Sequence, residues 1–300
     1  MLPELFRLPI IHLPVHTYGV MMVTGFLAAL YISYRQGLRQ GMLYNDALDF
    51  GFWALLGGIL GARIVFIMVE WRSYFIERPF VKVEALGINI PAVFALWQGG
   101  LVFWGSMIGG AVAFWIFCQK RGLPKAQFAD LMVIGIPLAQ VFGRIGCVAA
   151  GCCYGSPYYH IDAVGKVVSD LPLAMRFPMG SLAYNGLLEK ASPQLTEVMH
   201  NLGTTPPLFP SQLAEAFGAA GIFFVLLFVS TRKWFHGQVL LTYAILYSVM
   251  RSILELYRGD AARGYVIPGV LSTSQFISIL VVGASIIAML YWRGQNQRKA

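Results

Sequence analysis

The chain has 300 residues, of which 57% are hydrophobic and only 12% are charged. Soluble domains carry about twice that share of charged residues, and a soluble protein of this length needs far more polar surface to cover its core. The composition therefore predicts an integral membrane protein. The formal charge of +8 does not indicate a nucleic-acid-binding protein, because the basic residues lie in short loops between apolar runs and form no single patch.

Residues 1–16 hold three prolines and lack the basic region and apolar core of a cleavable signal peptide. Apolar segments follow this N-terminal stretch. A transmembrane helix needs about 20 mostly apolar residues. Seven segments meet that requirement, and they are residues 17–35, 46–69, 99–118, 128–150, 212–231, 237–256 and 274–292. The sequence thus predicts an all-α membrane protein of about seven helices, organised as one polytopic domain over residues 1–300.

Two of the predicted spans carry glycines four residues apart. Gly57 and Gly61 form one such pair, and Gly105 and Gly109 form another. Small residues at this spacing let helix backbones approach closely in lipid, where no hydrophobic effect drives helices together. We expect these pairs either to mark helix contacts or to be incidental glycines of membrane helices.

The charges of the loops indicate an orientation. One set of connections carries ten basic residues opposed by three aspartates, whereas the basic residues of the opposite set are balanced by acidic ones. Because Lys and Arg in short loops mark the cytoplasmic side, the N-terminus is predicted outside and the C-terminus in the cytoplasm. The long polar connection 152–211 is then predicted to form a small periplasmic cap between the fourth and fifth helices.

Six ionisable residues lie within or at the rim of these spans, although a charge at mid-bilayer costs at least about 2.5 kcal/mol. They are Arg63, Asp130, Arg144, Glu215, Arg251 and Glu255. Asp130 is interpreted as a solvated residue at the start of a helix, where a negative charge is favourable. The other five require a structural or functional reason.

Arg251, Glu255 and Arg258 lie along one face of a predicted helix. This row can be an internal ion pair that holds the bundle together, or an anion site, because guanidinium groups bind phosphate in a bidentate manner. Arg144 lies between Gly143 and Gly146 with no acidic residue near it in the sequence, so it is the strongest candidate for a phosphate ligand. Such a site suits an anionic lipid, and a small-anion transporter is the competing class.

Six motifs resemble those of the bacterial prolipoprotein diacylglyceryl transferases and follow the same order along the chain. They are spread through most of its length. They are His16-Thr17-Tyr18-Gly19, Gly61-Ala62-Arg63, Gly99 to Gly105, Gly143-Arg144-Ile145-Gly146-Cys147 with Gly151-Cys152-Cys153-Tyr154-Gly155, Pro210-Ser211-Gln212-Leu213 with Glu215, and Arg251 to Asp260 followed by Leu271 to Gln275.

The resemblance implies a seven-helix enzyme of the bacterial inner membrane, and we expect it to be a monomer. The resemblance also implies transfer of diacylglycerol from phosphatidylglycerol to the lipobox cysteine thiol of a preprolipoprotein, with glycerol phosphate leaving and no metal or soluble cofactor. In this interpretation Arg144 and Arg251 hold the phosphate, Glu255 and Arg258 orient the site, and Tyr18 lies beside the head group. Gly146 and Gly155 belong to the phosphatidylglycerol site.

Several residues depart from the family pattern. Trp104 stands where many members have His and some have Tyr, and an indole cannot act as a base. His16 is the nearest residue of a suitable type, so we expect it to be either a base or an interfacial residue. Because Trp104 replaces the usual polar side chain, two alternatives remain. The chain is either an active enzyme of a divergent branch or a paralogue that binds anionic phospholipid without transfer. Retention of all the motif arginines favours activity.

Cys147, Cys152 and Cys153 lie in one short stretch. A zinc site normally needs four well-spaced ligands, and free cysteine often behaves as a small buried hydrophobic residue. Packing beside the glycines is therefore preferred over a metal or redox centre, and a covalent nucleophile stays open.

Overall fold

The structure is a computed structural model that describes residues 4–7, 14–41, 46–77, 80–83, 88–95, 99–164, 166–258, 264–267 and 271–297. These residues are divided between two compact units. The first comprises Met1–Ser33 and Ala129–Ala300, and the second comprises Tyr34–Phe128.

Helices occupy the segments that the apolar pattern predicts. Among the described residues, five stretches are long and apolar enough to cross a membrane, and they are α1 (Thr17–Arg39), α2 (Asp46–Val69), Lys125–Ala150, α8 (Ser211–Thr231) and most of α10 (Thr273–Gln297). Two further helices, α3 (Phe103–Arg121) and α9 (Gln238–Glu255), fall on the remaining predicted spans. The prediction of an all-α membrane protein is confirmed at this level.

The predicted span 128–150 is formed by two helices rather than one. These are α4 (Lys125–Val133) and α5 (Gly135–Ala150), and Ile134 lies between them. Pro137 explains the break, because it has no N–H to donate to the carbonyl group of Val133 and its ring clashes with that carbonyl. The residues at the break are buried, among them Leu131, Val133 and Ile134.

Short antiparallel hairpins and small helices complete the described chain. The hairpins are β1 (Glu4–Arg7) with β2 (Pro14–His16), β3 (Phe80–Val83) with β4 (Ile88–Pro91), β5 (His160–Ile161) with β6 (Val167–Val168), and β7 (Tyr265–Ile267) with β8 (Leu271–Ser272). The small helices are Ser73–Glu77, Ala92–Phe94, α6 (Leu182–Leu188) and α7 (Pro193–Leu202).

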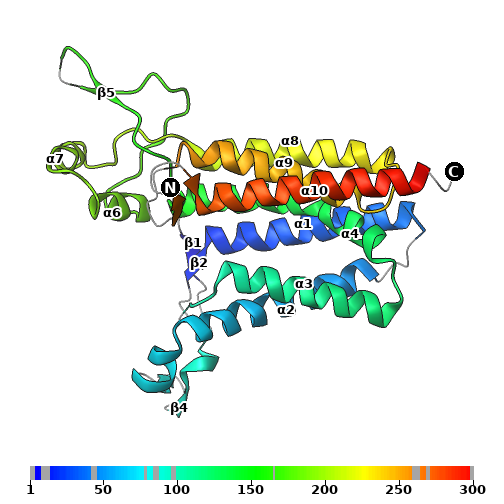
Figure 1. Ribbon diagram of the computed structural model, residues 1–300. Helices are drawn as coiled ribbons and strands as arrows, with labels where there is room; N and C mark the ends of the chain where they lie inside the picture. The colour runs from blue at the N-terminus through cyan, green and yellow to red at the C-terminus, as the bar shows by residue number, and fades with distance from the viewer. Residues whose placement is uncertain are drawn as a thin grey trace. The chain divides into compact units, whose positions relative to one another are not determined.

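The long helices of the first unit run side by side (Figure 1). α8 packs against both α5 and α9, and α10 packs against α9. Side chains of α5, α8 and α9 form a buried core around Ile134, Leu226 and Val239. Glycines bring α1 close to α5, because a Cβ atom at Gly135 would lie 2.6 Å from the carbonyl oxygen of Ala29.

The connection between α5 and α8 has a hydrophobic core of its own. Tyr154, Phe177, Tyr184, Met199 and Leu208 are buried together in it. This segment, which contains α6, α7 and β5, extends beyond the end of the bundle at which α5 ends and α8 begins (Figure 1). It is therefore a folded substructure joined to one end of the helices.

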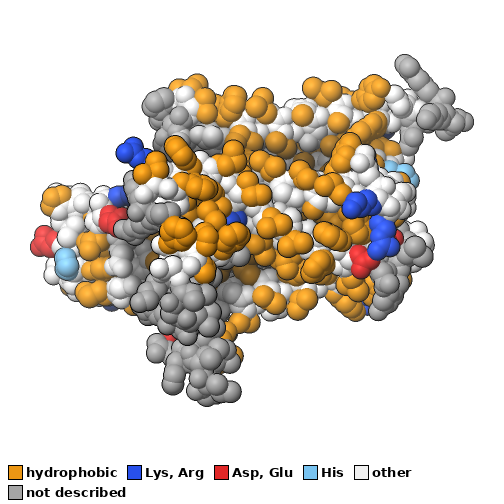
Figure 2. All heavy atoms as spheres, turned by 90° about the horizontal axis from the view of Figure 1, so that it is seen from below, with side chains coloured by type: hydrophobic (Ala, Val, Ile, Leu, Met, Phe, Trp, Pro, Cys, Tyr) orange, Lys and Arg blue, Asp and Glu red, His pale blue; other side chains and the backbone are white. Residues whose placement is uncertain are grey.

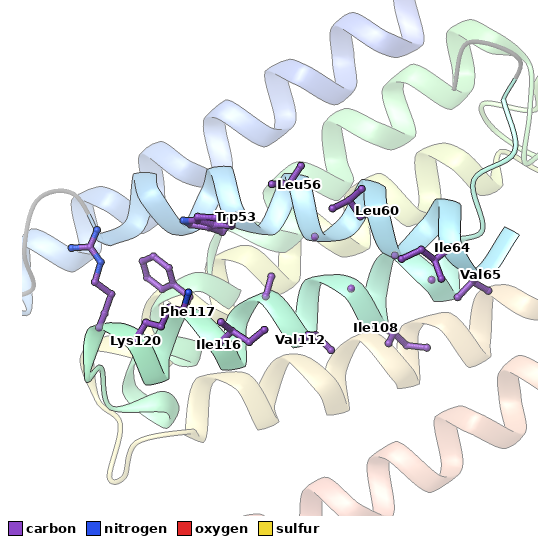
Figure 3. A pocket seen from close by; sticks show the side chains of 16 residues that line it. Trp53, Leu56, Leu60, Ile64, Val65, Ile108, Val112, Ile116, Phe117 and Lys120 are labelled. Carbon is purple, nitrogen blue, oxygen red and sulfur yellow. The ribbon is translucent and has the colours of Figure 1, made fainter. Parts of the chain in front are cut away.

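The second unit is built on close contact between α2 and α3. A Cβ atom at Gly61 would overlap the carbonyl oxygen of Gly105, and one at Gly109 would overlap that of Gly57. The two glycine pairs therefore pack against each other, which confirms their interpretation as helix contacts. An apolar groove of about 500 Å³ lies along this helix pair, and its walls include Leu60 and Ile108 (Figure 3).

Asp130 is not the solvated residue that the sequence analysis expected, since only 1% of its surface is exposed. Its carboxylate accepts hydrogen bonds from the backbone N–H groups of Gly237 at 2.8 Å and Leu240 at 3.0 Å, and from Lys233 Nζ at 3.3 Å. It thus stabilises the N-terminus of a different helix, α9, whose first N–H groups have no partner within the helix.

Large hydrophobic side chains cover the outer surface of the helices. Ile64, Phe224 and Ile287 are each more than half exposed. The face shown in Figure 2 is mostly hydrophobic, and its charged side chains are few and gathered in small groups. An apolar surface of this extent is typical of a protein whose helices contact lipid.

Candidate functional site

The centre of the candidate site is a buried ion pair between two helices of the first unit. Arg144 of α5 lies with Nη2 2.5 Å from Oε1 of Glu215 of α8. Their side chains are 20% and 4% exposed, so water screens the pair weakly. Sequence analysis found no acidic residue near Arg144 because the partner lies 71 positions further along the chain. An anion that binds Arg144 must therefore share it with a carboxylate.

The first turn of α8 fixes the loop that follows α5. Ser211 donates a hydrogen bond to the carbonyl oxygen of Cys153 at 2.8 Å, and Gln212 Nε2 donates one to that of Cys152 at 2.9 Å. Both donors are almost fully buried. Glu215 lies one helical turn beyond Ser211, so the motif Pro-Ser-Gln-Leu-x-Glu presents all three side chains to the site.

A row of polar side chains runs along α9 at intervals of four residues: Tyr243, Tyr247, Arg251 and Glu255. The two tyrosine rings stack with their centroids 5.6 Å apart, and Gln140 of α5 donates a hydrogen bond to the hydroxyl group of Tyr243 at 3.0 Å. Arg251 and Glu255 form the predicted ion pair at 2.7 Å. The row therefore lines the side of α9 that faces α5 and α8.

Arg258 follows the end of α9 and lies against the loop of Gly155. The two residues form an antiparallel bridge, and the N–H group of Ser156 donates to the carbonyl oxygen of Tyr257 at 3.0 Å. A side chain at Gly155 would overlap the carbonyl oxygen of Phe209, so only glycine fits there. This pairing ties the residues after α9 to the residues after α5.

The three arginines of the first unit gather around one tyrosine. Arg144, Arg251 and Arg258 all interact electrostatically with Tyr247, as does Glu215. Arg144 and Arg258 are also close enough to interact with each other. The structure therefore brings together the arginines that the sequence analysis selected, at the end of the bundle that carries the folded connection between α5 and α8.

Tyr18 lies beside this group on α1. A Cβ atom at Gly146 would lie 3.2 Å from Cδ2 of Tyr18, so the glycine allows the tyrosine ring to pack against α5. Tyr18 also interacts electrostatically with Arg144. His16, which was a candidate base, lies in β2 opposite Glu4 and its side chain is exposed.

Two residues of the sequence analysis belong to the second unit. Trp104 lies in the first turn of α3 with its side chain 49% exposed and its ring next to that of Phe103. Arg63 of α2 is 5% exposed, and its hydrogen bonds to described residues all go to backbone carbonyl oxygens, at distances of 2.8 to 3.3 Å. These oxygens belong to Ala92, Val93, Ala95, Gly99 and Gly100. Arg63 therefore holds a loop together, which is a structural reason for its burial.

Cys147, Cys152 and Cys153 form a cluster beside the arginines. Their three sulfur atoms lie within 4.8 Å of one another. Burial opposes ionisation of the Cys153 thiol, but S–H groups of Cys147 and Cys152, together with the positive charges of Arg144 and Arg258, hold its pKa well below the ordinary value. The cluster is therefore more polar than the packing of small residues that the sequence analysis preferred.

Comparison with known proteins shows the family of this chain. The sequence model described as "Prolipoprotein diacylglyceryl transferase" matches residues 3–291. The chain belongs to the prolipoprotein diacylglyceryl transferase family.

Similar members of the family come from several bacteria. The chain is 32% identical over 282 residues to the phosphatidylglycerol–prolipoprotein diacylglyceryl transferase of Clostridium tetani, and the alignment covers 94% of each chain. It is 30% identical over 275 residues to transferase 2 of Clostridium perfringens, covering 92% of this chain and 90% of the relative. It is also 30% identical over 291 residues to the transferase of Mycobacteroides abscessus, covering 95% of this chain and 76% of the relative.

The residues that support the arginines in this member of the diacylglyceryl transferase family were not predicted from the sequence. Ser211 and Gln212 were noted only as part of a motif, and Glu215 was not recognised as the partner of Arg144. Tyr243 and Tyr247 were not selected, although they continue the row of Arg251 and Glu255 at the same spacing of four. That spacing was the available signal.

Proposed function

We propose that this protein transfers the diacylglyceryl group of phosphatidylglycerol to the lipobox cysteine thiol of preprolipoproteins, the first step of bacterial lipoprotein maturation. Membership of the family supports the reaction. The observation that carries the proposal for the site is that Arg144, Arg251 and Arg258 are held at one end of the bundle, by Glu215, by Glu255 and by the backbone bridge to Gly155. The sulfur of the lipobox cysteine attacks the carbon of the diacylated glycerol that bears the phosphate. The bond between that carbon and the phosphate oxygen breaks, and glycerol phosphate leaves.

The charge of the site supports a phosphodiester as its ligand. The three guanidinium groups outnumber the two carboxylates that lie with them, Glu215 and Glu255. A phosphodiester carries one negative charge. Arginines held in place by ion pairs and exposed little to water are well arranged to stabilise the additional charge that develops on the leaving phosphate.

Each residue of the site has a proposed role. Arg144 and Arg251 bind the phosphate, and Arg258 and Glu255 orient it. Tyr18 lies beside the head group, and His16 is a second candidate at the start of the same helix. Gly146 permits the close approach of Tyr18, and Gly155 permits that of Phe209 beside its backbone bridge to Arg258. The positive charge also favours the thiolate form of the attacking cysteine by lowering its pKa.

The membrane arrangement follows from the same proposal. We propose seven spans, with the N-terminus outside and the C-terminus in the cytoplasm of a bacterial inner membrane. Residues 152–211 form a periplasmic cap over the arginines within a single polytopic domain of residues 1–300. Phosphatidylglycerol and the signal peptide of the preprolipoprotein then enter from the bilayer, and the enzyme acts as a monomer.

The proposal is tested with the purified protein, phosphatidylglycerol and a lipobox peptide. We expect release of glycerol phosphate and a gain in peptide mass equal to one diacylglyceryl group. Arg144→Ala abolishes both signals, whereas Arg232→Ala, an exposed residue at the other end of α8, leaves them unchanged. Release no greater than that of Arg144→Ala contradicts the proposal.

Complementation separates this enzyme from a paralogue that binds anionic phospholipid without transfer. The gene is expressed in a bacterial strain depleted of its own transferase. Growth with lipidated lipoproteins supports transfer. Failure to grow while the purified protein binds phosphatidylglycerol vesicles supports the non-catalytic alternative.

A further inference from the structure

The end of α5 folds the chain back so that its cysteines meet. The N–H group of Cys152 donates to the carbonyl oxygen of Cys147 at 3.1 Å, and that of Gly151 donates to Val148 at 3.3 Å, with Gly151 in the left-handed conformation. This pattern is a Schellman motif, and it returns the chain over the last turn of the helix. Cys152 is thereby brought next to Cys147 although five positions separate them.

Cys153 joins the cluster through an unfavourable backbone conformation. Its φ is +57°, in the left-handed region, which costs a residue with a side chain about 1–2 kcal/mol. The hydrogen bonds from Ser211 and Gln212 to the carbonyl groups of Cys153 and Cys152 hold this conformation. Strained backbone that is held by buried partners is concentrated at functional sites.

The three sulfurs lie close enough to one another to bind one metal ion. Zinc bound to thiolates has Zn–S distances of about 2.3 Å, so tetrahedral ligands lie about 3.8 Å from one another. Sulfurs within 4.8 Å reach that arrangement by small side-chain rotations. Cys147 is buried, whereas Cys152 and Cys153 are only partly buried, which leaves one side of the cluster accessible.

The neighbouring arginines favour a thiolate-bound cation. Three thiolates and one Zn²⁺ have a net charge of −1, and Arg144 and Arg258 act electrostatically on this cluster. The guanidinium groups therefore stabilise the complex as a whole. Soft thiolate ligands select Zn²⁺ or Cu⁺ among the biological metals, and Zn²⁺ accepts a fourth ligand in an open tetrahedral position.

We propose that Cys147, Cys152 and Cys153 bind Zn²⁺ and that the open fourth position takes the lipobox thiol of the substrate. This inference rests on the proposed function, and it departs from the expectation that no metal takes part. A thiol that coordinates zinc is deprotonated. The ion then supplies the activation of the thiol for which the indole of Trp104 is unsuited.

The reaction balances without any further reactant. The lipobox thiol binds to the zinc ion and releases its proton to water. Its sulfur forms a bond to the glycerol carbon of phosphatidylglycerol, the bond between that carbon and the phosphate oxygen breaks, and glycerol phosphate leaves with the electron pair. The resulting thioether carries no charge and is a weaker zinc ligand than a thiolate, so the product leaves and the site is ready for another thiol.

Metal binding is tested first, with the full-length protein in detergent under reducing conditions. After dialysis against metal-free buffer, the protein is titrated with Zn²⁺, and with Co²⁺ as a spectroscopic probe. We expect one Zn²⁺ per chain and thiolate-to-cobalt charge-transfer absorption. Cys147→Ser, Cys152→Ser and Cys153→Ser each weaken binding by about 100-fold or more, since even ligand-supporting residues contribute 10–100-fold.

The matched control is Cys118→Ser, because Cys118 is a free, buried cysteine of α3 in the other unit. Its variant binds Zn²⁺ as the wild type does. A wild type that binds no Zn²⁺, or cluster variants that bind it as tightly as the control, overturns the proposal.

A second measurement needs no variant that must fold. In the wild type, saturating Zn²⁺ blocks the labelling of Cys152 and Cys153 by maleimide, as read by mass spectrometry of the peptides. Mg²⁺ at the same concentration does not block it. Labelling that proceeds equally with both ions contradicts the site.

Activity then distinguishes this inference from the proposed function. Because a catalytic base contributes about 10²–10⁴-fold, the metal-free enzyme is expected to transfer at least about 100-fold more slowly, with recovery on addition of Zn²⁺. Full transfer by the metal-free enzyme overturns the zinc inference and leaves the proposed function intact. A protein that holds one Zn²⁺ but releases no glycerol phosphate supports the site and contradicts the proposed function.

Discussion

Arg144 of α5 and Glu215 of α8 form a buried ion pair with 2.5 Å between Nη2 and Oε1. The pair joins two helices whose residues are far apart in the sequence, and it holds the arginine that we assign to the phosphate. Glu215 therefore has two effects: it fixes the position of the guanidinium group, and it competes with the phosphate for it.

Removal of one partner from this pair should destabilise the protein. Glu215→Gln leaves Arg144 buried without its carboxylate, and breaking a buried pair in this way costs about 3–5 kcal/mol. The free energy of unfolding in denaturant measures the loss. The exchanged variant Arg144→Glu with Glu215→Arg restores part of the stability but not diacylglyceryl transfer. Transfer by the exchanged variant would contradict the role of Arg144.

The hydrogen bond from Ser211 to the carbonyl oxygen of Cys153 should contribute measurably to stability. Ser211→Ala leaves that buried carbonyl group without this donor, and we expect a loss of about 1–3 kcal/mol. Thermal unfolding of the purified protein gives the value. Ser230→Ala is the control on the same helix, because its hydroxyl group bonds only to the carbonyl oxygen of Leu227 within its own turn. Equal effects of the two variants would argue against a special role for Ser211.

Arg63 cannot be replaced by lysine without loss. Its guanidinium group donates to several carbonyl oxygens at once, whereas lysine has three donors on one nitrogen. Arg63→Lys should destabilise the second unit by about 1–3 kcal/mol and accelerate hydrogen exchange at Ala92, Ala95 and Gly100. Arg232→Lys, on an exposed residue, should change stability by less than about 0.5 kcal/mol. Unchanged exchange in Arg63→Lys would exclude the supporting role.

Adjacent glycines of α3 should respond differently to the same substitution. Gly109→Ala places a methyl group against the backbone of Gly57, and we expect overpacking to cost about 1–3 kcal/mol. Gly110→Ala meets no atom within 4 Å and should be neutral or stabilising by up to about 1 kcal/mol, because alanine favours helix. The free energy of unfolding of the two variants, measured in a graded mixture of detergents, compares the two substitutions. A neutral Gly109→Ala would show that α2 and α3 are not packed through their glycines.

The helices were predictable to the extent that apolar runs define them. The span 46–69 coincides with α2, but the predicted span 99–118 starts four residues before α3 does. Gly99 and Gly100 both have φ of +82°, so the backbone turns where the apolar pattern continues. Pro137 similarly divides one predicted span into α4 and α5. Hydropathy records the environment of a residue, and these breaks depend on backbone conformation instead.

The candidate site was predictable residue by residue but not in its connections. Arg144, Arg251 and Arg258 were selected because a buried charge requires a reason. The pairing of Arg144 with Glu215 has no local signature, because no rule of helix spacing relates residues on two helices. The meeting of the three cysteines depends on a helix end and on a left-handed residue that bears a side chain, which the sequence pattern did not indicate.

The first turn of α8 makes two parts of the site move as one body. Ser211 and Gln212 hold the loop of Cys152 and Cys153, and Glu215 on the next turn holds Arg144. A rotation of α8 about its axis therefore changes both contacts together. A small molecule wedged between α5 and α8 would displace the arginine and the loop at once, so an inhibitor of this enzyme need not imitate a phospholipid or compete with one.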